Sequence, residues 1–192
     1  VAAFKSRYPR VGLHIRPALT GASLAEIERG NLDVALITQP HLMPAGTVFR
    51  PLVEEKMQLI TAIEEPEDDP LKLLRGRPYI RFNRNAVLGT LTDNWIRSKR
   101  IRVTETMELD SAEAITSMVQ ANLGVSIVPD LTIKPAEAGT VKRLSLGESG
   151  PSRVLGLAYL EDQIKARAVD AVFDAFAGVI AATQSDGAGT AE

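Results

Sequence analysis

The stretch Ser23-Leu24-Ala25-Glu26-Ile27-Glu28-Arg29-Gly30-Asn31-Leu32-Asp33-Val34-Ala35-Leu36-Ile37 decides the fold class of this chain. Ser23 and Glu26 have the spacing of a capping box, which predicts a helix that Ser23 caps and Gly30 ends. The run 32–37 is almost continuously apolar, as is typical of a short strand buried in a parallel sheet. A helix followed at once by a buried strand indicates an α/β architecture.

Segments of the same two kinds recur along the sequence. Apolar alternation or short apolar runs predict strands at 11–15, 57–62, 79–82, 103–107, 125–128 and 154–160. The spacing of apolar residues predicts helices at 1–8, 88–95, 111–123 and 164–180. We expect Asn83, Asn85 and Asp110 to act as caps of the two middle helices. Strands separated by helices predict parallel sheets with helices on both faces.

The composition excludes several classes of protein. The 192 residues include 22 lysines and arginines and 24 aspartates and glutamates, for a net charge of −2. A nucleic-acid-binding domain usually has a net basic face, so we do not expect this chain to bind DNA by itself. There is no cysteine, which excludes disulfides, thiolate catalysis and cysteine-bound zinc. No apolar run approaches the ~20 residues of a membrane span, and no signal peptide is visible, so we expect a cytoplasmic location without membrane contact.

Residues with catalytic chemistry are few. The sequence has two histidines, of which His14 lies in a predicted amphipathic strand and His41 in a proline-rich loop. It has no Gly-x-Ser-x-Gly elbow, no phosphate-binding loop and no His-Glu-x-x-His motif. The acidic stretch 64–70 has the composition of a solvated loop. We therefore expect no enzymatic activity, no metal site and no cofactor, although folding could still bring two distant carboxylates together.

Three ordered motifs resemble the effector-binding domain of LysR-type transcription regulators. Phe4-Lys5-Ser6-Arg7-Tyr8-Pro9-Arg10-Val11 is similar to the family pattern F-x-x-x-Y-P-x-V. The segment 24–36 is similar to L-x-x-G-x-L-D-x-A-L, and the segment 119–129 to V-x-x-G-x-G-I-x-x-L-P. Asn122 departs from the third pattern, because family members usually carry glycine there. Each motif alone reflects packing and capping, and Asp33 in the second is expected to bind backbone amides, but three in order are more specific.

The resemblance implies two Rossmann-like lobes of the type 2 periplasmic-binding-protein class, with the second lobe inserted into the first. It places residues 1–61 and 159–182 in the first lobe and 62–158 in the second, and we expect 183–192 to be a disordered tail. The family's first lobe usually opens with a strand that this sequence does not contain, so either the sequence is truncated before it or the first sheet lacks it. The family's N-terminal helix-turn-helix domain is also outside this sequence.

Candidate ligand contacts follow from the geometry of such folds. Ligands bind beyond the carboxyl ends of strands, where helix N-termini offer free backbone amides. An arginine at such an end could hold a carboxylate through two hydrogen bonds. Thr20 matches a position where family members often place a ligand-contacting serine or threonine, although a turn or capping role stays open for it. The candidate ligand-binding residues are Leu19, Thr20, Gly21, Thr38, Gln39, Thr61, Arg81, Phe82, Asn83, Arg84 and Ser111.

These observations favour an effector sensor. The resemblance implies that a small anionic metabolite binds between the lobes and shifts their orientation, which requires different affinities for the two states. It also implies a homodimer or homotetramer, with an antiparallel contact through 1–8 and 11–15, that controls DNA binding through the absent N-terminal domain. Two alternatives stay open, namely a solute-binding protein of a transport system and, less favoured, an enzyme on the same fold.

Overall fold

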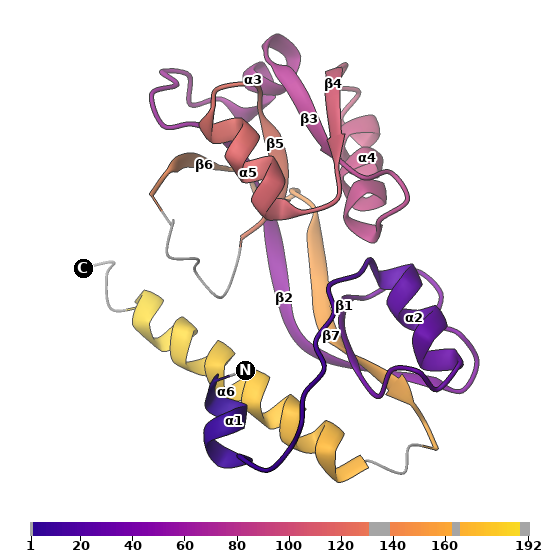
Figure 1. Cartoon of the computed structure of the whole chain (residues 1–192). Helices are drawn as coiled ribbons and strands as arrows, with labels where there is room; N and C mark the ends of the chain where they lie inside the picture. Colours follow the sequence, from indigo (N-terminus) through magenta and orange to yellow (C-terminus); the bar gives the residue numbers. More distant parts are fainter. Residues whose placement is uncertain (1, 131–138, 163–165, 189–192) are drawn as a thin grey trace. The chain divides into compact units, whose positions relative to one another are not determined.

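The chain divides into two compact units. The structure is a computed structural model that describes residues 2–130, 139–162 and 166–188 (Figure 1). The first unit comprises the described residues within Val1–Val53 and Val154–Glu192, and the second comprises those within Glu54–Arg153. The second unit is therefore an insertion in the first, as the sequence predicts.

The first unit combines three helices with a sheet whose strand order is β1-β7-β2. Strand β1 pairs antiparallel with β7, from Ala35 opposite Ala158 to Thr38 opposite Leu155. Helix α1 contacts α6, and Figure 1 shows the two side by side. The elements of this unit are α1 (Ala2–Arg7), α2 (Thr20–Glu28), β1 (Ala35–Thr38), the first part of β2 (Thr47–Ala62), most of β7 (Ser152–Leu160) and α6 (Ala166–Ala188).

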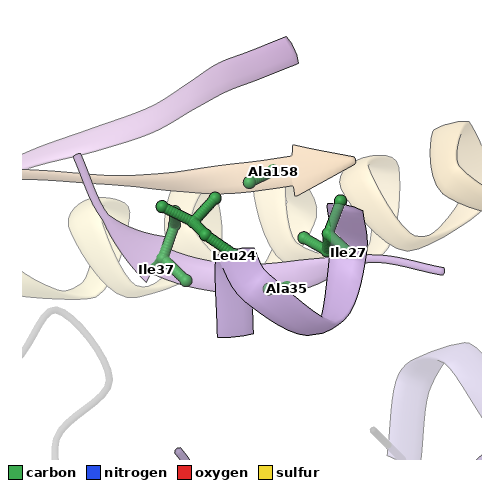
Figure 2. Close-up of a cluster of buried hydrophobic side chains, with 5 residues drawn as sticks. All are labelled: Leu24, Ile27, Ala35, Ile37 and Ala158. Carbon is green, nitrogen blue, oxygen red and sulfur yellow. The ribbon is translucent and has the colours of Figure 1, made fainter. Parts of the chain in front are cut away.

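Helix α2 packs on the sheet of the first unit through the residues that the helical spacing predicts. Leu24 and Ile27 are buried against Ala35 and Ile37 of β1 and Ala158 of β7. Figure 2 shows the two α2 side chains pointing toward these strands. Burial of such side chains stabilises the fold by roughly 1.5–3 kcal/mol each. This cluster fixes α2, and with it the chain at Thr20, on the sheet.

The second unit contains a parallel pair of strands and an antiparallel group. Strands β3 and β4 are parallel, with Phe82 opposite Leu109 at their carboxyl ends. Strand β2 pairs antiparallel with both β5 and β6, and Tyr79 bridges to Val125, just before β5. The remaining elements are α3 (Pro70–Gly76), β3 (Pro78–Phe82), α4 (Val87–Ser98), β4 (Thr104–Leu109), α5 (Ala112–Gln120), β5 (Ser126–Pro129) and β6 (Val141–Ser145).

The boundaries of the units differ from those expected from the sequence. The chain leaves the first unit within β2, between Val53 and Glu54, and returns within β7, between Arg153 and Val154. Both passages lie earlier than the expected limits at 61/62 and 158/159. Helix α6 continues to Ala188, so residues 183–188 of the expected disordered tail are helical. The last part of that prediction, 189–192, lies outside the described residues.

The predicted strand at 11–15 is wrong. Residues 11–19 form neither helix nor strand, and Val11, Leu13 and Ile15 are exposed. Apolar alternation indicates that a segment can pair, but a strand forms only where a neighbouring strand completes its hydrogen bonds. Within the described ranges no strand does so for this segment.

Three capping predictions are also wrong. The carbonyl of Leu19 already accepts a hydrogen bond from the amide of Ser23, so α2 begins one turn earlier and Ser23 lies inside it. Helix α4 begins after Ala86 without a side-chain cap, because the Asn83 side chain accepts from the amide of Asn85 within the preceding loop. Ser111, and not Asp110, caps α5, since its Oγ accepts from the amide of Ala114.

The sheets are only partly parallel. The β3–β4 pair confirms the predicted parallel arrangement, but the pairs β1–β7, β2–β5 and β2–β6 are antiparallel. The antiparallel partners are distant in the chain, since the helices α3, α4 and α5 lie between β2 and β5. None of the helices in the described part of the chain is long and apolar enough to span a membrane.

Candidate functional site

The candidate residues of the first unit lie together. Leu19 precedes α2, Thr20 and Gly21 open it, and Thr38 and Gln39 follow at the end of β1. The hydroxyl of Thr20 donates to the carbonyl of Thr38 at 3.5 Å, and the amide of Gln39 donates to the carbonyl of Val154 at 2.8 Å. No side chain caps the N-terminus of α2. This region offers uncharged hydroxyl and amide groups beside a helix N-terminus.

The candidate residues of the second unit other than Thr61 lie at the carboxyl ends of β3 and β4. Because Phe82 and Leu109 are opposite each other in the parallel register, the loops that follow them are neighbours. The Asn83 side chain donates to the Asp110 carboxylate at 2.5 Å, which connects the two loops next to Ser111. Phe82 itself is buried. The structure thus brings the β3–α4 and β4–α5 loops together.

Gly89 explains how α4 approaches the β3–α4 loop so closely. A Cβ atom at this position would overlap the Asn83 carbonyl oxygen and would lie 2.9 Å from the Phe82 carbonyl oxygen. Any side chain there would force the first turn of α4 away from the loop. Gly89 therefore helps to fix the backbone of Asn83 and Arg84. The sequence alone did not point to this glycine.

Arg81 is buried in a network of charges. Its guanidinium forms ion pairs with Asp93 of α4 and, at 2.8 Å, with Glu105 of β4, and Glu108 lies 4.0 Å away. Burial works against the charge of Arg81, but the hydrogen bond and charge of Asp93 and the charge of Glu105 outweigh it and raise the arginine pKa. Charges that are buried need such partners. Arg81 is therefore already neutralised by groups of its own unit.

Arg84 is exposed and is held by Glu108. The Glu108 carboxylate accepts hydrogen bonds from the backbone amide of Arg84 at 3.1 Å and from its Nε at 3.0 Å. The Arg84 Nη2 atom is 2.9 Å from the same carboxylate and 3.5 Å from Glu105. The Arg84 side-chain and backbone hydrogen bonds lower the pKa of Glu108. Glu108 is thus an anion at neutral pH.

Sequence reasoning missed the acidic partners of the two arginines. It singled out Arg81 and Arg84 as possible anion ligands but not Asp93, Glu105 or Glu108. The predicted strands at 79–82 and 103–107 were a usable signal for one of these contacts, because pairing them in parallel would place Glu105 of one near Arg81 of the other.

Thr61 lies apart from the two loops. It is near the end of β2, opposite Lys142 of β6, and is fully buried. The carboxyl end of β5 is opposite Met57, at the other end of the β2–β5 pairing. The Thr61 hydroxyl has no hydrogen-bond partner among the residues that the structure describes. Thr61 therefore belongs to the interior of the sheet and not to the strand ends that carry the other candidates.

The chemistry available to the candidate residues is that of binding. Hydroxyl, amide and guanidinium groups can donate hydrogen bonds to a small polar or anionic molecule. Within the described ranges no group of three or more histidine, aspartate or glutamate side chains has the arrangement of a metal site.

Comparisons with known proteins identify the family. The model of the LysR substrate binding domain matches residues 1–181. The HTH-type transcriptional regulator SoxR of Arthrobacter sp. is 25% identical over 144 residues, which are 75% of this chain and 48% of the relative. The hydrogen peroxide-inducible genes activator of Haemophilus influenzae is 24% identical over 168 residues, covering 83% of this chain and 54% of the relative. The chain thus spans about half the length of these curated relatives.

Solved structures agree on the fold. The effector-binding domain of QuiR in complex with shikimate has a TM-score of 0.75 and 22% identity, and the match covers 92% of this chain and 85% of that one. A reduced form of OxyR from N. meningitidis has a TM-score of 0.76 and 18% identity, with coverage of 93% and 86%. The expected α/β, type 2 periplasmic-binding-protein-like fold is confirmed. The family is not one of enzymes. The chain belongs to the LysR substrate-binding domains, the effector-binding part of LysR-type transcriptional regulators.

Proposed function

We propose that this chain binds a small anionic effector and that binding controls transcription through a helix-turn-helix domain outside these residues. The single observation that carries the ligand class is the pair of loops at the carboxyl ends of β3 and β4, where Arg84 and Asn83 lie next to Ser111. Guanidinium and amide donors at a strand end are suited to a carboxylate. Shikimate, which QuiR binds, is a small carboxylate and supports the same class.

Thr20 and Thr38 of the first unit would bind uncharged hydroxyl or carbonyl groups of the same effector. The Thr20 hydroxyl and the amides at the start of α2, where the N-cap residue Leu19 makes no side-chain capping hydrogen bond, are uncharged groups that can bind such a ligand. Contacts from both units would let the effector favour one arrangement of the units over another, since only differential affinity shifts such an equilibrium. The 192 residues contain no cysteine, so sensing by thiol oxidation within them is excluded.

The experiment is calorimetric titration of the chain with a panel of small carboxylates that includes shikimate. Replacement of Thr20 by alanine should weaken binding of the active compound about fivefold or more, because a hydrogen bond to a ligand is lost. Thr106→Ala removes an equally small hydroxyl from an exposed position of β4 and should leave the affinity unchanged. Equal affinity in the wild type and Thr20→Ala would remove Thr20 from the site.

We also propose that the regulator works in the cytoplasm as a homodimer or homotetramer. The exposed apolar side chains of Val11, Leu13 and Ile15, together with α1, are the surface suggested for the contact between copies. Extended segments with unpaired backbone groups are ready to pair with another strand. Analytical ultracentrifugation should show association at micromolar concentrations, and a chain that stays monomeric at every concentration would contradict this part of the proposal.

A further inference from the structure

The contact between Arg84 and Glu108 has the form of carboxylate recognition. Both carboxylate oxygens are engaged, one by the backbone amide of Arg84 at 3.1 Å and the other by its Nε at 3.0 Å and its Nη2 at 2.9 Å. A guanidinium fork combined with a backbone N–H is how proteins hold a free carboxylate or phosphate. Here the anion is supplied by the protein itself, from the neighbouring strand β4.

We propose that Arg84 and its backbone amide form a binding site for the carboxylate of the effector, and that Glu108 occupies this site as an internal competitor. The inference rests on the proposed function for the identity of the anion, which we take to be the effector. An incoming carboxylate would replace Glu108 at the same three donors and release it to solvent. The affinity for the effector is then set partly by how strongly Glu108 competes.

The exposure of the two arginines decides which of them can exchange its partner. The Arg84 side chain is 57% exposed and that of Glu108 is 35% exposed, so their ion pair is of the weak, solvent-screened kind. The Arg81 side chain is only 6% exposed and is bound to Asp93 and Glu105. Breaking a buried pair is far more costly than breaking an exposed one. Arg84 is therefore the arginine that can accept an external anion, and Arg81 holds the strands in place beneath it.

Release of Glu108 would change the charges around it. A second arginine also lies close to Glu108, since the Arg81 Nε is 4.0 Å from its carboxylate. Glu108 is two residues before Asp110, which binds Asn83, and three before Ser111, which caps α5. The displaced carboxylate would leave Arg84 free to turn toward the ligand. Anion binding would thereby act directly on the end of β4 that leads into α5.

The proposal can be tested with inorganic sulfate as the probe, independently of the natural effector. The ¹H–¹⁵N NMR signal of the Arg84 amide is followed during titration of the wild type, Glu108→Gln and Glu113→Gln. Glu113 lies in the first turn of α5 and carries the same charge, so its replacement controls for net charge. The half-saturating sulfate concentration should fall about fivefold in Glu108→Gln, as removal of a weak ion pair implies, and change little in Glu113→Gln.

A double variant tests whether Glu105 binds Arg84 in place of Glu108 once Glu108 has been replaced. Glu105 also reaches Arg84, at 3.5 Å, so the Glu105→Gln/Glu108→Gln double variant should bind sulfate at least as tightly as Glu108→Gln. The proposal is overturned if the half-saturating concentration is the same in the wild type and in both variants.

A measurement on the wild type needs no variant to fold. Saturating sulfate should raise the pKa of Glu108 toward its ordinary value of 4.5, because Arg84 would no longer pair with it. An unchanged pKa at saturation would show that sulfate does not displace Glu108. Sulfate binding at Arg84 without binding of any carboxylate in the panel would support an anion site with Glu108 as its competitor, but it would overturn the assignment of that site to a carboxylate effector.

Discussion

The first and second units hold their candidate binding residues in opposite ways. In the first unit, one 3.5 Å hydrogen bond between uncharged groups joins Thr20 to Thr38, and apolar packing holds α2 on the sheet. In the second unit, Arg81 and Arg84 are fixed by carboxylates from α4 and β4. The difference teaches that the candidate residues of the first unit depend on packing beneath them, whereas those of the second unit depend on charge pairing among them.

The largest effect should come from breaking the packing of the first unit. Ile27 is fully buried between α2 and the sheet. Replacement by alanine removes apolar contacts and leaves a cavity, so the free energy of unfolding should fall by about 4 kcal/mol. Urea unfolding followed by circular dichroism measures this change. Leu42→Ala removes as many carbon atoms from an exposed side chain of the first unit and should cost well under 1 kcal/mol, and similar losses for both variants would contradict the packing account.

A somewhat smaller loss should follow from breaking the charge pairing of the second unit. Arg81→Met leaves Asp93 and Glu105 next to an apolar side chain, and we expect a loss of about 3 kcal/mol. Trp95 is the only tryptophan of the chain and lies in this unit, so its fluorescence during urea unfolding reports the effect. Arg97→Met replaces an exposed arginine of α4, the helix that carries Asp93, and should alter the free energy of unfolding by less than about 1 kcal/mol. Equal effects of the two variants would show that the network around Arg81 does not stabilise the unit.

The smallest effect on stability should come from the ionisation of Tyr79, an uncharged residue that lies near Arg81 on β3. Burial raises the pKa of Tyr79 to about 12, an effect that the nearby Thr92 hydroxyl reduces only in part. The folded protein therefore keeps this proton when the unfolded chain, with an ordinary value of 10.0, has lost it. Stability is fully present below pH 10 and falls by roughly 2 kcal/mol as pH rises from 10 to 12.

Tyr79→Phe isolates that effect. The Tyr79 hydroxyl meets ordinary hydrogen-bond geometry with no group in the described ranges, so its removal should be nearly neutral at pH 7. The variant should lose less stability than the wild type between pH 10 and 12, measured by urea unfolding at each pH. The same decline in both proteins would assign the alkaline effect to other groups.

The sequence predicted what depends on local pattern. Leu24, Ile27 and Ile37 occur at the spacing of a helix face and a buried strand, and they form the core of the first unit. The position of the β3–α4 and β4–α5 loops followed equally from strand ends and helix starts. Such patterns are set by residues close together in the chain, and a single sequence is sufficient to recognise them.

What the sequence did not predict depends on partners that are distant in the chain. The alternation at Val11, Leu13 and Ile15 indicates a strand, but no strand among the described residues pairs with it. Arg84 was expected to be available to a ligand, yet Glu108, which is 24 residues away, binds it. Ion pairs and strand neighbours of this kind are decided by the assembled fold, where tertiary context outweighs local preference.

The strand order β1-β7-β2 has a consequence for biosynthesis. The middle strand of the first unit's sheet is β7, and the part of β7 that belongs to this unit follows the whole of the second unit in the chain. Domains generally fold as units while the ribosome elongates the chain from its N-terminus. Residues 54–153 can therefore fold during translation before the rest of β7 has been synthesised. Until then, β1 and the first part of β2 lack the strand that lies between them in the sheet. Within these residues, synthesis of the first unit begins before that of the second unit and ends after it.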